Sequence, residues 1–238
     1  MKKAIIIGAT SGIGKELAKI LSKEGYKVGL SGRRNQLLEA IQSENPQTFE
    51  ILQLDVVEIE TLQEKLDDLV DKLGGLDLLV ISSGTGDLNP MLDFNIEKIT
   101  IDTNITGFTF VADWAFRYFE KQHSGHLVGI TSIAGLRGNR IAPSYNATKS
   151  YQINYLEGLR QKARKSKQDI TVTDIRPGFV ATDMAKGEGQ FWVATPEKAA
   201  RQIFAAICRK KRTAYITKRW GLIALLLKIL PKRMYERM

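Results

Sequence analysis

The segment Lys2-Lys-Ala-Ile-Ile-Ile-Gly8-Ala-Thr-Ser-Gly12-Ile-Gly14, at the amino terminus, decides the fold of this chain. Its apolar run before Gly8 predicts a short buried strand, and the residues after Gly14 have the apolar spacing of an amphipathic helix. Glycines at a strand-to-helix turn let the backbone bend tightly and approach a pyrophosphate, whose charge is attracted by the free amides at the helix start. The segment therefore predicts a dinucleotide-binding turn.

Similar apolar runs recur along the chain and predict a sheet. Strands are predicted at residues 3–8, 27–31, 50–54, 76–81, 127–132, 170–175 and 214–217, with helical stretches between them. This alternation is typical of parallel strands joined by right-handed crossovers. We therefore predict an α/β fold: a doubly wound, mostly parallel sheet with helices on both faces, as in a Rossmann-type three-layer sandwich. Ligands of such sheets bind at the carboxyl ends of the strands.

Length and composition favour a single-domain enzyme. The 238 residues are 43% hydrophobic and contain no linker, internal repeat or low-complexity stretch, so we assign residues 1–238 to one domain. Cys208 is the only cysteine, which excludes an internal disulfide, and we expect a cytoplasmic location. His123 and His126 have no companions at metal-ligand spacing, so we predict no metal site.

The basic charge of the chain is concentrated at its carboxyl end. Residues 209–238 contain ten Lys or Arg and one acidic residue, which accounts for the whole net charge of +9. Within them, the eleven residues from Trp220 to Leu230 are nearly all apolar, but a bilayer requires about 20. This extension either lies on the inner membrane surface, attracted by anionic lipid, or packs on the enzyme and closes the pocket or joins a partner subunit. The apolar run and the lack of a recognised nucleic-acid module argue against nucleic acid as a partner.

The segment Pro143-Ser-Tyr-Asn-Ala-Thr-Lys149, which follows Ser132, predicts a device for proton transfer. On a helix, Tyr145 and Lys149 share one face, which brings the ammonium beside the phenol. A free phenol has a pKa of about 10, and a neighbouring cation favours the phenolate. We therefore expect Lys149 to lower the pKa of Tyr145. Taken alone, this spacing is common and favours an ordinary exposed helical pair.

Six features in order make the chain similar to the short-chain dehydrogenase/reductase family over nearly its whole length. They are Gly8-x-x-x-Gly12-x-Gly14, Asp55, Asn104, Ser132, Tyr145-x-x-x-Lys149 and Pro177-Gly178. The resemblance implies that hydride passes from a nicotinamide to a substrate carbonyl while Tyr145 donates a proton and Ser132 positions the oxygen. It also implies that Lys149 binds the nicotinamide ribose and that Asn104 holds a water that resupplies the proton. Two alternatives remain: the reverse oxidation of an alcohol, and a non-catalytic NADPH-binding regulatory or membrane-associated protein.

The end of the second predicted strand favours NADP over NAD. Gly32 stands where NAD-binding proteins place an acidic residue for the ribose 2′-hydroxyl, and two arginines follow it. We expect Arg33 to bind the 2′-phosphate, and Arg34 to lie over the adenine or face water. With the resemblance, the predicted cofactor residues are Gly8, Thr10, Ser11, Gly12, Ile13, Gly14, Arg33, Arg34, Asp55, Val56, Ser83, Gly84, Tyr145, Lys149, Pro177, Gly178, Val180 and Thr182.

The chain departs from the family at Ser82-Ser83-Gly84-Thr85, where the family usually has Asn-Asn-Ala-Gly. Residues 183–195 stand where the family has its substrate lid. Gly187 and Gly189 would allow this segment to close. Phe191 and Trp192 would either line an apolar pocket or pack in the core beneath the loop. We expect a carbonyl substrate, bulky or lipid-like. The resemblance also implies a homodimer or homotetramer formed through the helices around 104–122 and 147–166.

Overall fold

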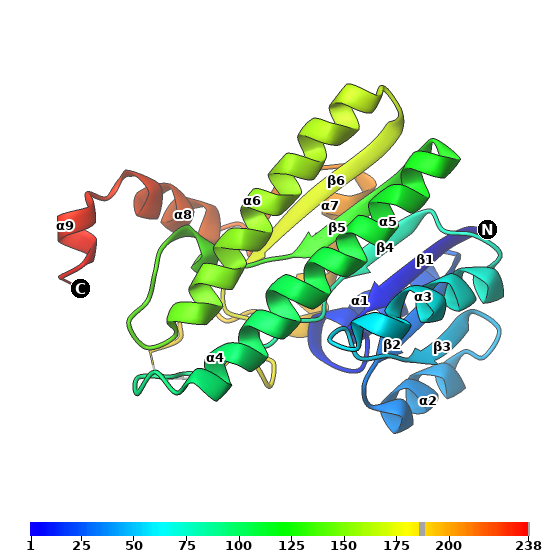
Figure 1. Cartoon of the computed structure of the whole chain (residues 1–238), viewed down its shortest axis with the longest axis horizontal. Coiled ribbons are helices and arrows are strands. Elements are labelled where there is room, and N and C mark those ends of the chain that lie inside the picture. The colour runs from blue at the N-terminus through cyan, green and yellow to red at the C-terminus, as the bar shows by residue number, and fades with distance from the viewer. Residues whose placement is uncertain (186–188, 238) are drawn as a thin grey trace.

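A seven-stranded parallel sheet forms the centre of the protein (Figure 1). The structure is a computed structural model, which describes residues 1–185 and 189–237. The strand order is β3-β2-β1-β4-β5-β6-β7, and all pairings are parallel. The strands are β1 (Lys2–Ile7), β2 (Tyr26–Gly32), β3 (Phe49–Gln53), β4 (Leu78–Ile81), β5 (Ser124–Ile130), β6 (Asp169–Pro177) and β7 (Thr213–Ile216). The predicted doubly wound α/β fold is confirmed.

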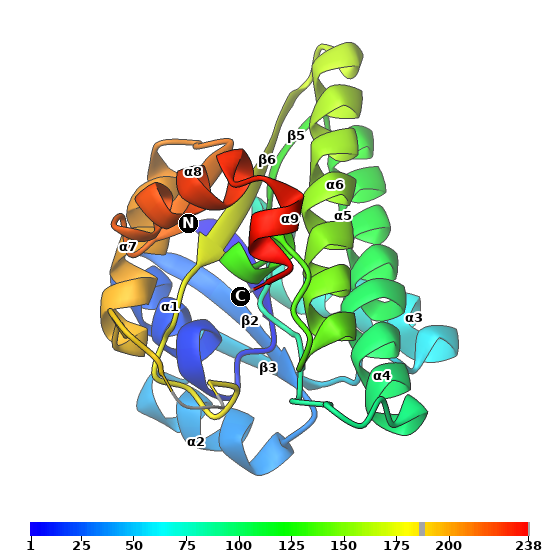
Figure 2. The ribbon, with the colours of Figure 1, turned by 90° about the vertical axis from the view of Figure 1, so that its left-hand side faces the viewer.

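Helices cover both faces of this sheet. The longer elements are α1 (Gly12–Lys23), α2 (Asn35–Glu44), α3 (Ile59–Leu73), α4 (Phe94–Ile101), α5 (Phe108–Gln122), α6 (Pro143–Ser166), α7 (Pro196–Cys208) and α8 (Trp220–Ile229). Shorter ones are α9 (Lys232–Tyr235), the π-helical turn η1 (Asp102–Gly107) and the 3-10 turn η2 (Ile133–Leu136). Figure 2 shows α3, α5 and α6 on one face of the sheet, and α1, α2 and α7 on the other.

Alternation along β1 explains how one strand supplies two cores. Ile5 and Ile7 belong to the core beneath α3, α5 and α6, whereas Ala4 and Ile6 belong to the core beneath α1, α2 and α7. All four side chains are almost completely buried, because successive side chains of a strand point to opposite faces and both faces are covered. This is why β1 reads as a continuous apolar run.

The strand order reverses between β1 and β4, which opens a crevice at their carboxyl ends. After β1 the chain continues through α1 to β2, and β4 lies on the other side of β1. The loop after β4 stays close to β1, because the amide of Ser82 donates a 2.8 Å hydrogen bond to the carbonyl of Ile7. Such a reversal is where open α/β sheets bind their ligands.

The chain beyond β7 lies beside the carboxyl edge of the sheet. Figure 2 faces this edge, with α8 and α9 lying across it. The indole of Trp220 and the side chain of Ala224 are buried in a small cluster with Ile133. Arg137 donates hydrogen bonds to the carbonyls of Leu227 and Leu230, which attaches the end of α8 to the loop after η2. Within residues 1–185 and 189–237, no helix is both long and apolar enough to cross a membrane.

Candidate active site

One large cavity, of about 830 Å³, lies at the carboxyl edge of the sheet. It brings together nearly all of the predicted site residues, which come from loops that are far apart in the sequence. Those that line it are Gly8, Thr10, Ser11, Gly12, Ile13, Arg33, Arg34, Asp55, Val56, Ser83, Gly84, Ser132, Tyr145, Lys149, Pro177, Gly178, Val180 and Thr182. Gly14 and Asn104 do not line it.

Gly14 supports the nucleotide turn from beneath. A Cβ atom on Gly14 would lie 2.1 Å from the carbonyl oxygen of Gly8, so only glycine lets the start of α1 approach the end of β1 this closely. The glycine pattern therefore has two functions: Gly8 and Gly12 line the cavity, and Gly14 permits the packing that shapes it.

Asn104 lies in the π-helical turn and fastens the loop after β4. Its Oδ1 accepts a 2.9 Å hydrogen bond from the Thr85 amide, and its Nδ2 donates to the Thr85 carbonyl at 2.7 Å and to the Thr148 hydroxyl at 3.1 Å. Asn104 is completely buried, so these bonds satisfy its amide. Asn104 bonds only the backbone of Thr85, so its bonds do not depend on the glycine that the family usually has at this position.

The loop requires glycine at position 86, and Gly86 was not among the predicted site residues. A Cβ atom there would lie 2.2 Å from Cδ2 of Tyr145, so the loop can pass the phenol ring only with glycine at this position. It could have been predicted, because Gly86 follows directly after Thr85, the position where the family usually has glycine. Gly86 also lines the cavity.

Tyr145 is in the first turn of α6, where Pro143 suits the helix start. Its phenol shares a hydrogen bond with Ser132. Burial raises the pKa of Tyr145 above its usual value, and the Ser132 bond opposes this increase only in part. The predicted decrease in the Tyr145 pKa is therefore wrong for this structure. The physical reason is distance, because Lys149 Nζ lies 5.8 Å from the centre of the phenol ring and donates elsewhere.

Lys149 is buried and held by two acceptors. Its Nζ donates to the carbonyl of Ile130 at 3.2 Å and to Oε1 of Gln152 at 2.9 Å. Gln152 in turn donates from Nε2 to the carbonyl of Asn104 at 2.8 Å. Burial lowers the pKa of Lys149 to about 8, and the negative charge of Asp174 opposes this decrease. Sequence reasoning missed Gln152, whose only signal was its position three residues after the lysine on one helix.

The two arginines after β2 also line the cavity. Arg34 donates to the hydroxyls of Thr10 and Ser11, both at 2.8 Å, so it lies across the glycine-rich turn and does not simply face water. Arg33 is largely exposed and comes within 3.9 Å of the Asp55 carboxylate. Both guanidinium groups therefore lie beside predicted cofactor residues, Arg34 by Thr10 and Ser11 and Arg33 by Asp55.

Aromatic side chains form the wall next to Pro177-Gly178. The rings of Phe179, Phe191 and Trp220 contact one another, with centroids 4.9 to 6.1 Å apart. Gly178 packs against the Trp220 indole, and Leu227 and Tyr235 of the carboxyl-terminal extension also line the cavity. One face of α8 thus packs on the enzyme, which is one of the two arrangements predicted for the extension. In the predicted lid, Gly187 lies outside the described residues.

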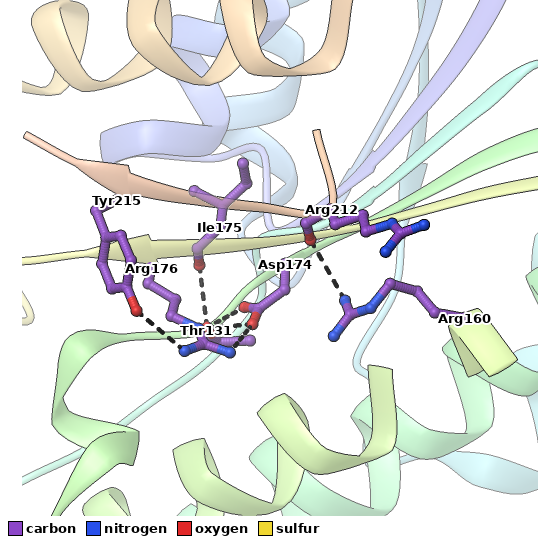
Figure 3. Close-up of polar contacts among 7 residues, drawn as sticks. All are labelled: Thr131, Arg160, Asp174, Ile175, Arg176, Arg212 and Tyr215. Carbon is purple, nitrogen blue, oxygen red and sulfur yellow. Dashed lines mark hydrogen bonds and ion pairs between the residues drawn. The ribbon is translucent and has the colours of Figure 1, made fainter. Parts of the chain in front are cut away.

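A buried polar cluster lies along β6 (Figure 3). Arg176 pairs with the Asp174 carboxylate at 2.7 Å and contacts the Tyr215 hydroxyl at 3.3 Å. Thr131 donates to Asp174 at 2.6 Å. Burial raises the pKa of Asp174, and Arg176 is the first of the groups that oppose this increase. Asp174 and Arg176 are two residues apart in a strand and so share one face of the sheet, which is the signal that could have found this pairing.

Two buried polar atoms at the cavity have no hydrogen-bond partner in the described part of the chain: Ser83 Oγ and Trp220 Nε1. Buried polar groups rarely remain unpaired, so these atoms fit a cavity that receives a polar ligand. Three or more His, Cys, Asp or Glu side chains do not come together as a metal site among residues 1–185 and 189–237.

Comparison with known proteins agrees with this geometry. The family profile described as short chain dehydrogenase matches residues 2–191. The chain belongs to the short-chain dehydrogenase family. Among curated relatives, an uncharacterized oxidoreductase of Myxococcus xanthus is 34% identical over 77% of this chain and 74% of its own length. Another, from Staphylococcus epidermidis, is 31% identical over 78% of this chain and 81% of its own.

Solved short-chain dehydrogenases share the fold. One from Streptomyces avermitilis has a TM-score of 0.83 and 22% identity, covering 95% of this chain and 91% of its own. ElxO with NADP bound has a TM-score of 0.78 and 25% identity, covering 90% of this chain and 96% of its own. As a short-chain dehydrogenase, this protein is an oxidoreductase of a family that uses nicotinamide cofactors.

Proposed function

We propose that this short-chain dehydrogenase reduces a ketone or aldehyde to an alcohol with NADPH. One observation carries the proposal: the phenol of Tyr145, paired with Ser132, lines the same cavity as the glycine-rich turn and Lys149. A proton donor and a nucleotide cradle in one cavity are what carbonyl reduction requires.

The cavity residues suit a nicotinamide dinucleotide. The turn at Gly8 and Gly12 would hold the pyrophosphate, and the unpaired Ser83 hydroxyl offers a hydrogen bond at the end of β4. Arg33 would bind a 2′-phosphate, and Arg34, attached to Thr10 and Ser11, would keep the turn in shape. When bound, NADPH supplies the hydride that reduces the carbonyl carbon.

The protonation state of Tyr145 supports reduction over oxidation. Because burial raises its pKa, the phenol keeps its proton at neutral pH and can donate it to the carbonyl oxygen as negative charge develops there. Oxidation of an alcohol would need the phenolate, which the same burial disfavours. Ser132 would hold the carbonyl oxygen at donor distance, and the Lys149 ammonium would bind the nicotinamide ribose.

The wall of the cavity favours a substrate with an apolar body. Phe179, Phe191 and Trp220 stand next to Gly178, and Leu227 continues this surface. Aromatic and aliphatic side chains contribute contact area without selecting one polar group. We therefore propose a bulky or lipid-like carbonyl compound as substrate. We also propose that the enzyme forms a homodimer or homotetramer through α5 and α6 in the cytoplasm.

Tyr145→Phe tests the proposal. The substitution removes only the hydroxyl, so we expect kcat/KM with NADPH and a panel of apolar ketones and aldehydes to fall about a hundredfold or more. NADPH binding, followed by the change in its fluorescence, should stay near that of the unmodified enzyme. Turnover undiminished in this variant would exclude Tyr145 as the acid. NADPH binding by the unmodified protein without turnover of any carbonyl would instead favour a regulatory, non-catalytic function.

A further inference from the structure

Helix α8 has two apolar faces, and only one of them is covered. Trp220 and Ala224 are buried against the enzyme, at 4% and 1% exposure. On the opposite face Leu222 is 70% exposed, Leu225 59%, Leu226 52% and Ile229 69%. These four residues recur at helical spacing, so they form one continuous stripe, which we call the α8 stripe. An exposed aliphatic stripe of this kind is unusual on a monomeric soluble protein and indicates an interaction surface.

The α8 stripe is flanked at both ends by basic residues. Lys218 and Arg219 precede the helix, Lys228 lies within its last turn, and Lys232 and Arg233 follow it. Between residues 209 and 237 the sole acidic residue is Glu236. Lys228, Lys232 and Arg233 are exposed, so their charges are available to a negatively charged partner. The surface therefore has an aliphatic centre and a cationic rim.

This combination disfavours a second copy of the chain as the occupant. A symmetric dimer brings the same patch of two subunits together, which would place the basic residues of one rim close to those of the other. Like charges brought together in this way oppose association. The surface of an anionic bilayer offers both required features, because its headgroups are negative and its acyl chains accept aliphatic side chains.

We propose that α8 docks on the surface of an anionic lipid bilayer, with the α8 stripe at the boundary between headgroups and acyl chains. The helix has ten residues, too few to span the bilayer, so the protein lies on the membrane and does not cross it. The buried Trp220 and the bonds from Arg137 hold α8 to the enzyme, so the whole molecule is recruited with it. Leu227, on the same helix, lines the cavity, so docking puts the cavity wall within one helix diameter, about 10 Å, of the bilayer.

Flotation of the purified full chain with lipid vesicles tests this proposal. One set of vesicles contains phosphatidylcholine alone, and the other contains equal parts of phosphatidylcholine and phosphatidylserine. We expect binding to the anionic set only, with release by high salt, because the basic rim acts through screened charges. Ile229→Glu should weaken that binding about tenfold or more, because it places an acidic group in the docking face. Lys232→Gln with Arg233→Gln should weaken it and reduce its salt dependence.

Leu37→Glu is the matched control. Leu37 is an exposed leucine on α2, away from the extension, so the same change of an apolar residue to an acid should leave vesicle binding unchanged. NADPH binding and far-UV circular dichroism of each variant check that the fold is retained. Failure of the unmodified chain to float with anionic vesicles overturns the proposal, as does equal flotation of the Ile229→Glu variant. A dimer in solution that Ile229→Glu converts to a monomer, without vesicle binding, would identify a second copy as the occupant and also overturn it.

Discussion

Lys149 donates a 2.9 Å hydrogen bond to the side-chain oxygen of Gln152, and this contact holds the buried ammonium in place. The amide of Gln152 cannot turn over, because its nitrogen donates to the Asn104 carbonyl. Gln152 therefore bridges the two groups between which the family resemblance implied a water. An amide has no readily transferable proton, so we infer that Gln152 positions Lys149 and does not pass protons to it.

Replacing Gln152 should shift the pH dependence of reduction. In Gln152→Leu the ammonium loses an acceptor, which should lower the Lys149 pKa below its present value of about 8 and move the alkaline limb of kcat/KM down by about one pH unit. Gln152→Glu places a negative charge beside the ammonium and should move the same limb upward. The measurement is the pH profile of NADPH-dependent turnover. If both variants lose activity but keep the profile of the unmodified enzyme, Gln152 has only a packing role.

Arg33 and Arg34 should differ in their effect on cofactor choice. Arg33 is exposed and available to a 2′-phosphate, so Arg33→Ala should raise the Kd for NADPH about tenfold or more and barely change that for NADH. Arg34 is bonded to the hydroxyls of the glycine-rich turn, so Arg34→Ala should weaken both cofactors to a similar extent. Fluorescence titrations with the two cofactors measure this. A loss shared equally by both cofactors in Arg33→Ala would argue against the 2′-phosphate assignment.

The buried pair of Asp174 and Arg176 should make stability sensitive to substitution. Arg176→Met leaves the Asp174 carboxylate buried without its cation, which should lower the free energy of unfolding by about 3–5 kcal/mol at neutral pH. The loss should shrink at acidic pH. The reason is that an acid whose folded pKa is raised destabilises the fold only when it is ionised, above its unfolded pKa. Urea unfolding at two pH values measures both effects, and the double variant with Asp174→Asn should recover part of the loss. A pH-independent loss would contradict the electrostatic cause.

His126 should make the fold sensitive to mild acid. Burial lowers its pKa from 6.5 to about 4, and its Nε2 lies 2.8 Å from the Thr173 hydroxyl. A base whose folded pKa is lowered binds a proton more readily when unfolded. The free energy of unfolding should therefore decrease by about 3 kcal/mol in all as pH falls from 6.5 towards 4. His126→Gln should flatten this part of the stability profile. His123→Gln, at an exposed position, is the control and should leave it unchanged.

Local sequence patterns were enough to predict the sheet and most of the cavity. Each of the seven predicted strands overlaps an observed one, because a strand buried on both faces is a continuous apolar run that can be read without its neighbours. The glycine-rich turn, Ser132 and the Tyr145 to Lys149 spacing were recognisable for the same reason, since each is defined within a few residues. Their meeting in one cavity follows from parallel strands that end at the same edge.

The protonation states and the place of the carboxyl-terminal extension were decided only by tertiary structure. Whether Lys149 acts on Tyr145 depends on which acceptors surround the ammonium, and Ile130 and Gln152 are brought there by folding. The composition of α8 predicted an apolar helix but not which side would be covered. The Trp220 indole packs against Gly178, so that face of α8 is buried and the opposite face is left exposed. Burial and distance are properties of the assembled fold, whereas periodicity is a property of the chain.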